Sequence, residues 1–91
     1  MNLTALNLAI VDDNGETRKI MKERLSEIFQ GIAVSVSIQT FDSALSYLAS
    51  YKDHSYNLTF LDIEMPGMDG IQLARKLEGE EIPTQIIYVS N

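Results

Sequence analysis

The sequence predicts an α/β fold built on a parallel sheet. Four short apolar segments alternate with segments whose apolar residues recur at helical spacing, and this alternation is typical of strand–helix–strand units. The chain has 91 residues, of which 45% are hydrophobic and 22% are charged. This size and composition indicate one small globular domain over residues 1–91 rather than a disordered or fibrous chain.

The first half of the chain predicts two strands and one helix. Leu6 to Val11 is nearly continuous in its apolar character, as in strands that are covered on both faces. A helix is expected from Gly15 to Gln30, with Gly31 as a stop signal. Ile32 to Gln39 alternates apolar and polar residues, which indicates an exposed or edge strand. The apolar face of the helix comprises Ile20, Met21, Arg24, Leu25, Ile28 and Phe29.

A second helix is expected to end at Tyr51, with Asp42 or Ser43 as its N-terminal cap. Tyr47 lies four residues before Tyr51, and the pair is interpreted as helix packing rather than as a functional aromatic stripe. The inner stripe of this helix is predicted to comprise Ala44, Leu45 and Leu48.

The second half of the chain supplies the remaining elements. Leu58 to Leu61 is the third predicted strand, and a loop from Met65 to Gly70 follows it. A helix is expected from Ile71 to Leu77, closed by Gly79, and the last strand runs from Gln85 to Val89. Right-handed crossovers between these strands predict the sheet order 2-1-3-4, with a ligand crevice beyond the carboxyl ends of strands 1 and 3.

Composition excludes several classes of function. Cysteine is absent, so the chain has no disulfide framework or Cys-based zinc site, and a cytoplasmic location is expected. The single histidine, His54, lies in a polar loop and is interpreted as a surface residue rather than as a catalytic base. A net charge of −6 argues against direct nucleic-acid contact by this chain. No apolar run is long enough to span a membrane, so no membrane association is expected.

Carboxylates follow two of the predicted strands. Asp12 and Asp13 come directly after Val11, and Asp62 comes directly after Leu61. Three carboxylates in one crevice repel one another unless a cation is bound, and no Lys or Arg is adjacent to them in sequence. Magnesium, which prefers oxygen ligands, fits such a site. The alternative is that the first two aspartates only cap the following helix.

The loop after Asp62 is also informative. Gly67 and Gly70 are expected to supply unusual backbone dihedrals, so that the carbonyls of the loop can face a metal ion. The side chains of Glu64 and Asp69 are interpreted as loop polarity rather than as ligands.

Ser90 follows the last predicted strand, where it is either an ordinary turn residue or a hydroxyl that can hydrogen-bond an oxyanion on Asp62. Together with Val11–Asn14 and Leu61–Gly70, the segment Val89–Asn91 makes the sequence resemble the receiver domain of two-component response regulators. The three segments occur in the family's order and spacing over the whole chain, and the second is highly specific.

The resemblance implies a flavodoxin-like receiver fold and a signalling role rather than an enzyme. Asp62 would be the phosphoacceptor, phosphorylated by a sensor histidine kinase. Asp13, Asp62 and the main-chain carbonyl of Glu64 would bind magnesium, with Asp12 acting through water. Ser90 would be the switch hydroxyl.

One departure from the family is large. Receivers continue after the switch hydroxyl with a fifth strand, which carries a lysine that contacts the phosphoryl group, and with further helices; none of these follows Asn91 in this sequence. A truncated receiver without the catalytic lysine is therefore expected, together with a homodimer or swapped oligomer formed through its last strand. Ile87–Asn91 is similar to regulators with LytTR-type DNA-binding output domains, which predicts an output domain outside this chain.

Two alternatives belong to other classes. A phosphatase of the haloacid dehalogenase type also uses a strand-end aspartate and magnesium, but it needs a second aspartate where Glu64 stands. Hydrolysis of a model phosphate ester would separate it from a receiver. The other alternative is a non-catalytic interaction module, which a reactive phosphodonor would leave unmodified.

Overall fold

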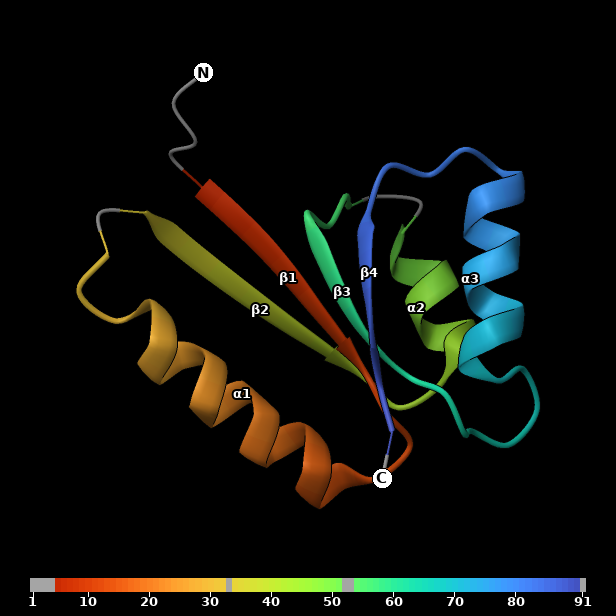
Figure 1. Ribbon diagram of the computed structural model, residues 1–91, viewed down its shortest axis with the longest axis horizontal. Coiled ribbons are helices and arrows are strands. Elements are labelled where there is room, and N and C mark those ends of the chain that lie inside the picture. Colours follow the sequence, from red (N-terminus) through yellow and green to blue (C-terminus); the bar gives the residue numbers. More distant parts are fainter. Residues whose placement is uncertain (1–4, 33, 52–53, 91) are drawn as a thin grey trace.

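The structure, a computed structural model, describes residues 5–32, 34–51 and 54–90. Four parallel strands form one sheet in the order β2-β1-β3-β4, which confirms the predicted order (Figure 1). Helix α1 lies on one face of the sheet, and α2 and α3 lie on the other. The elements are β1 (Ala5–Val11), α1 (Gly15–Phe29), β2 (Ser35–Phe41), α2 (Ala44–Tyr51), β3 (Leu58–Asp62), α3 (Gly70–Gly79) and β4 (Gln85–Val89).

Strand β1 is the buried centre of the sheet, as its continuous apolar character predicts. Its last four residues, from Leu8 to Val11, have no exposed surface. Ala9 and Val11 belong to the core under α2 and α3, together with Leu61 of β3 and Leu73 of α3. The strand therefore fixes the position of everything that follows Val11.

A chain of hydroxyl groups, buried at its centre, connects α2 to the sheet. The Tyr47 hydroxyl lies 2.9 Å from the Thr59 hydroxyl, which in turn lies 2.8 Å from the hydroxyl of Thr84. Burial raises the pKa of Tyr47, although its hydrogen bonds to the threonines oppose that shift. The Tyr47 ring also packs against the ring of Tyr51, with centroids 6.3 Å apart, so the interpretation of this pair as helix packing is confirmed.

The second strand lies later in the chain than predicted. β2 begins at Ser35 rather than at Ile32, because pairing with β1 starts at Ser35 and the Ile32 amide donates to the Phe29 carbonyl in the turn after α1. Ala33, within the predicted strand, lies outside the described residues. The predicted edge position is correct, and exposure alternates along β2.

The helix faces are predicted less well. No residue of α1 is fully buried, and Ile28 is 65% exposed, whereas Met21 and Leu25 are half-buried. In α2, Leu45 is 72% exposed, and the predicted inner position is occupied instead by Tyr47. The reason is geometric. When Ala44 faces the sheet, helical spacing also brings the residues three and four positions later, Tyr47 and Leu48, to the inner face, whereas the adjacent Leu45 faces outward.

None of the helices in the described ranges is long and apolar enough to cross a membrane.

Two leucines provide a matched test of this packing. Leu61→Ala should lower the free energy of unfolding by about 2–5 kcal/mol, because it leaves a cavity in the core. Leu45→Ala should change it by only about 0.5 kcal/mol or less, because this side chain is largely in solvent. Urea denaturation of both variants measures the difference, and equal losses would contradict this assignment of inner and outer positions.

Candidate functional site

The carboxyl ends of β1 and β3 bring three aspartates together. Val11 pairs with Leu61 in the sheet, so Asp12 follows one strand at the level where Asp62 ends its neighbour. One carboxylate oxygen from each of Asp12, Asp13 and Asp62 lies within 4.8 Å of the others. The predicted convergence of these three residues is therefore confirmed.

Helix capping does not explain these aspartates. The N-cap of α1 is Asn14, whose side chain accepts a hydrogen bond from the Thr17 amide at 3.0 Å. Asp12 instead accepts a hydrogen bond from the Asn14 amide at 2.8 Å, which holds its carboxylate in the loop between β1 and α1. The alternative that Asp12 and Asp13 cap α1 is wrong, so their carboxylates remain available to bind a ligand.

The site is unfavourable for the negative charges that it holds. Asp12 and Asp62 are only 3% and 6% exposed, whereas Asp13 is open to solvent. Burial raises the pKa of Asp62, and repulsion from Asp12 and Asp13 raises it further, against the opposing effect of a hydrogen bond from the Glu64 amide. Among the described residues the only ion pair joins Lys76 to Glu80, so none of the three carboxylates has a basic partner.

Arg18 contributes to the site and was missed from the sequence. Its guanidinium donates a hydrogen bond of 2.7 Å to the main-chain carbonyl of Asp12. Residue 18 is six positions from residue 12, but the first turn of α1 returns it to the end of β1. The missed signal is a cation in the first turn of the helix that follows the aspartates. Arg18 fixes the β1–α1 loop without pairing with a carboxylate.

The two glycines of the loop between β3 and α3 have different structural roles. Gly67 has a φ of 77°, in the left-handed region, as predicted. The prediction of an unusual dihedral at Gly70 is wrong: this residue opens α3, and a Cβ there would lie 2.2 Å from the Asp62 carbonyl oxygen. Its amide donates to the Ile63 carbonyl at 3.0 Å. Gly70 therefore supplies the space that lets α3 begin directly behind Asp62.

The side chains of Glu64 and Asp69 do not belong to the cluster of three aspartates, which agrees with their interpretation as polar loop residues rather than ligands. Asp69 caps α3 by accepting from the Gln72 amide, and the Gln72 side chain accepts from the Asp69 amide, both at 2.9 Å. The Glu64 side chain is exposed, while its amide donates to Asp62 Oδ1 at 3.2 Å. The role of the Glu64 carbonyl as a metal ligand stays a prediction.

Ser90 follows β4 at the same edge of the sheet. Val89 pairs with Asp62, and the Val89 carbonyl accepts a hydrogen bond of 3.2 Å from the Ile63 amide. The Ser90 side chain is exposed, and its role as a switch hydroxyl stays a prediction. His54 is also exposed, but it lies beside Asn7, near the start of β1 and therefore far from the cluster.

Known proteins share this sequence pattern. Residues 8–91 match the family described as the response regulator receiver domain. Stress response regulator protein 1 of Debaryomyces hansenii is 32% identical over 85 residues, which cover 93% of this chain and 34% of that protein. Transcriptional regulatory protein MalR of Bacillus subtilis has the same identity and the same coverage. The chain thus spans about a third of the length of these relatives.

Solved structures of response regulators superpose on this chain. The MaeR response regulator bound to beryllium trifluoride superposes with a TM-score of 0.82, covering 93% of this chain and 66% of that chain; at 21% identity the likeness establishes the fold alone. The response regulator TrrA from Thermotoga maritima, in complex with Mg²⁺ and BeF, superposes with a TM-score of 0.80 at 29% identity, covering 93% of this chain and 69% of that one.

The raised pKa of Asp62 predicts a pH-dependent gain in stability for Asp62→Asn without metal. The folded chain holds the Asp62 proton more tightly than the unfolded chain, so the resulting stability is complete below the unfolded pKa, near 3.8, and is lost as pH rises through the folded pKa. Asparagine avoids this loss. In EDTA, Asp62→Asn should therefore be more stable than the parent at pH 7 and lose this advantage below about pH 4.

Urea denaturation at several pH values measures this difference. Glu23→Gln, which removes an exposed carboxylate on α1, is the control and should show no such trend. A lower stability of Asp62→Asn at pH 7 would contradict the unfavourable charge.

Proposed function

The chain belongs to the response regulator receiver domain family, and we propose that residues 1–91 act as one receiver domain in which Asp62 accepts a phosphoryl group from a sensor histidine kinase. Membership of this family makes the chain a phosphoacceptor signalling module rather than an enzyme, so the phosphatase alternative is rejected. The observation that carries the proposal is the position of Asp62, buried at the end of β3 with two carboxylates beside it and no ion-pair partner among the described residues.

The geometry suits Asp62 as a nucleophile. Its Oδ1 accepts the hydrogen bond from the Glu64 amide, which orients the carboxylate and leaves the second oxygen for attack. A bond forms between that oxygen and phosphorus while the bond from phosphorus to the kinase histidine breaks, and the histidine nitrogen keeps the electron pair. In this proposal Asp62 both binds the ion and accepts the phosphoryl group, whereas Asp12 and Asp13 serve only to hold the ion.

The donor set fits magnesium, which takes carboxylate and carbonyl oxygens together with water. Asp13, Asp62 and the Glu64 carbonyl would hold the ion directly, and Asp12 would act through water. When bound, Mg²⁺ neutralises charge on the transferring oxygens. Three carboxylate oxygens lie within 4.8 Å of one another, and none of the three side chains has an ion pair with another described residue; both observations support this assignment. The Mg²⁺ in the TrrA complex, at 29% identity, supports it further.

Ser90 is proposed as the residue that senses the modification. Phosphorylation of Asp62 adds a group with about 1.5 to 2 negative charges, which attracts a nearby hydroxyl donor. Ser90 follows Val89, which pairs with Asp62 in the sheet, so the end of β4 lies beside the end of β3 that carries the phosphoacceptor. In the whole protein this response would control an output domain. A DNA-binding output of LytTR type is supported by the similarity of the Ile87–Asn91 segment to such regulators.

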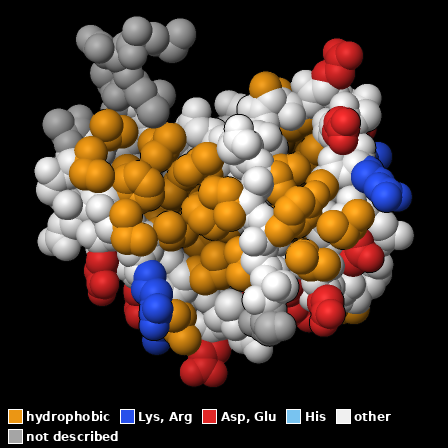
Figure 2. Space-filling model, in the orientation of Figure 1, with side chains coloured by type: hydrophobic (Ala, Val, Ile, Leu, Met, Phe, Trp, Pro, Cys, Tyr) orange, Lys and Arg blue, Asp and Glu red, His pale blue; other side chains and the backbone are white. Residues whose placement is uncertain are grey.

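We also propose that residues 1–91, studied as a separate polypeptide, form a homodimer or swapped oligomer through β4. Among the described residues this strand pairs only with β3, so its other edge carries backbone groups with no strand partner in that part of the chain. Ile87 and Tyr88 are 39% and 47% exposed, on opposite faces of the strand. Figure 2 shows further hydrophobic side chains gathered over the strands. Light scattering across a dilution series should show dissociation, and a well-folded monomer at every concentration would contradict association.

Acetyl phosphate tests the phosphoacceptor directly. Incubation of residues 1–91 with this donor and Mg²⁺ should add one phosphoryl group by intact-mass spectrometry, and Asp62→Asn should abolish the addition. Asp42→Asn, the same change at an exposed position, is the control. Addition should be slow, since this polypeptide lacks the fifth-strand lysine, and one such charge is worth on the order of a hundredfold in rate.

Two outcomes would contradict the assignment. Modification that survives in Asp62→Asn would place the acceptor elsewhere. A complete lack of Mg²⁺-dependent modification would favour the non-catalytic interaction module.

A further inference from the structure

A groove between α2 and α3 has no part in the proposed phosphoryl transfer. It encloses about 840 Å³, within the range of sites that bind small molecules or peptide side chains. Both helices run antiparallel to the strands, so their C-terminal ends lie away from the edge that holds Asp62 (Figure 1). The groove extends along α2 from Leu45, in the first turn of that helix, to Tyr51, whereas on α3 it lies at the C-terminal end. Its lining comprises Leu45, Leu48, Ala49, Tyr51, Lys76, Glu80, Glu81 and Ile82.

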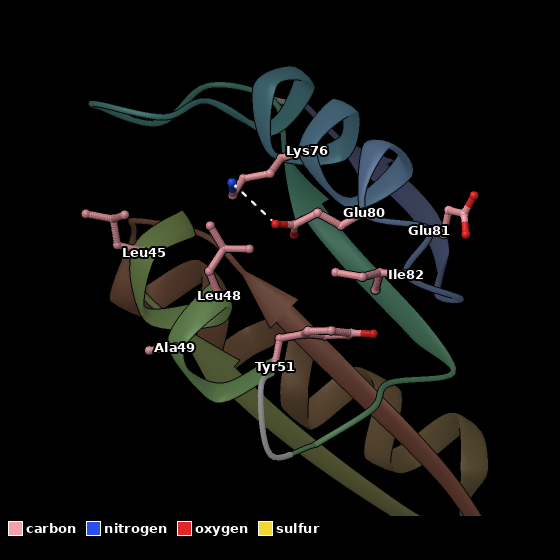
Figure 3. Close-up of a pocket in the computed structure, with 8 residues that line it drawn as sticks. All are labelled: Leu45, Leu48, Ala49, Tyr51, Lys76, Glu80, Glu81 and Ile82. Atoms are coloured by element: carbon pink, nitrogen blue, oxygen red, sulfur yellow. Dashed lines mark ion pairs between the residues drawn. The ribbon is translucent and has the colours of Figure 1, made fainter.

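The floor of the groove is apolar and firmly supported. Leu48, Tyr51 and Ile82 are half-buried and pack against the core beneath them, and their side chains converge in Figure 3. Leu45 stands beside them with 72% of its surface exposed. Leu45, Leu48, Tyr51 and Ile82 thus place four apolar side chains along the groove.

The rim of the groove is negative. The C-terminal ends of α2 and α3 each carry the equivalent of about half a negative charge. Glu80 and Glu81 add two carboxylates, while Lys76, the single cation among the described lining residues, is engaged with Glu80 at 3.6 Å. Glu81 has a φ of 56°, a left-handed conformation that glycine would adopt more readily. It lies at the outer end of the groove, and in Figure 3 its carboxylate is directed away from Leu48 and Ile82.

We propose that this groove binds a basic amphipathic helix of a partner protein. Apolar residues at positions i, i+3 or i+4, and i+7 of that helix would contact Leu45, Leu48 and Tyr51, as in other helix-in-groove complexes. Its Lys or Arg residues would lie beside Glu80 and Glu81, whose charge repels acidic segments and nucleic acid. A second copy of the chain fits less well, because each copy carries a net charge of −6.

A library of displayed helical peptides, selected against the full chain, tests the proposal. Recovered peptides should carry the apolar helical pattern and a net positive charge. Leu45→Asp should weaken their binding at least tenfold, measured by calorimetry. Glu81→Gly should weaken it several-fold and make it less sensitive to salt, and it leaves the fold intact because glycine suits this backbone. Ile28→Asp, an exposed change on α1, should have no effect.

The contrary results are equally defined. Recovery of no peptides, of acidic or unpatterned peptides, or of peptides that bind Leu45→Asp as well as the parent would overturn the proposal. Self-association that Leu45→Asp abolishes would assign the groove to a second copy instead. Mg²⁺-dependent modification by acetyl phosphate should be unchanged in Leu45→Asp, so failure of the groove is distinguishable from failure of the phosphoacceptor site.

Discussion

The structure depends on one electrostatic constraint: a parallel sheet holds three carboxylates together at its carboxyl edge. The register of β1 with β3 sets the distance between Asp12 and Asp62, and neither strand can shift without breaking buried pairing. In a folded chain these charges cannot separate to relieve their repulsion, and burial adds a desolvation cost, which is why the pKa of Asp62 is raised. A divalent cation bound among the three carboxylates relieves that cost.

Several local features keep the constraint in place. Asn14 caps α1, so the aspartates before it are not consumed as caps. Arg18 holds the β1–α1 loop through the Asp12 carbonyl rather than through a carboxylate. Gly70 lets α3 start against the Asp62 backbone, where any Cβ would collide. These features raise the rigidity of the site without neutralising it, as expected of a site whose charge balance is completed from outside.

The parts that the sequence predicts correctly are those that depend on local patterns. The apolar runs predict the strands, and right-handed crossovers predict the order of the sheet, so the meeting of Asp12, Asp13 and Asp62 follows from chain direction alone. The errors have tertiary causes. Leu45 and Tyr47 cannot be assigned to inner and outer positions until the rotation of α2 is known, and the approach of Gly70 to Asp62 is invisible in composition. Arg18 was missed because it reaches the Asp12 carbonyl only when the first turn of α1 brings it back to the end of β1.

The central claim is that repulsion among these carboxylates is relieved by a bound cation, and the most direct measurement is the free energy of unfolding of the parent chain as a function of Mg²⁺ concentration at pH 7. Above the dissociation constant, stability should rise by about 1.4 kcal/mol for each tenfold increase in Mg²⁺, as required when only the folded state binds the ion. The increase should be much smaller in Asp62→Asn. A stability that does not change with Mg²⁺, or that rises equally in both chains, would contradict the claim.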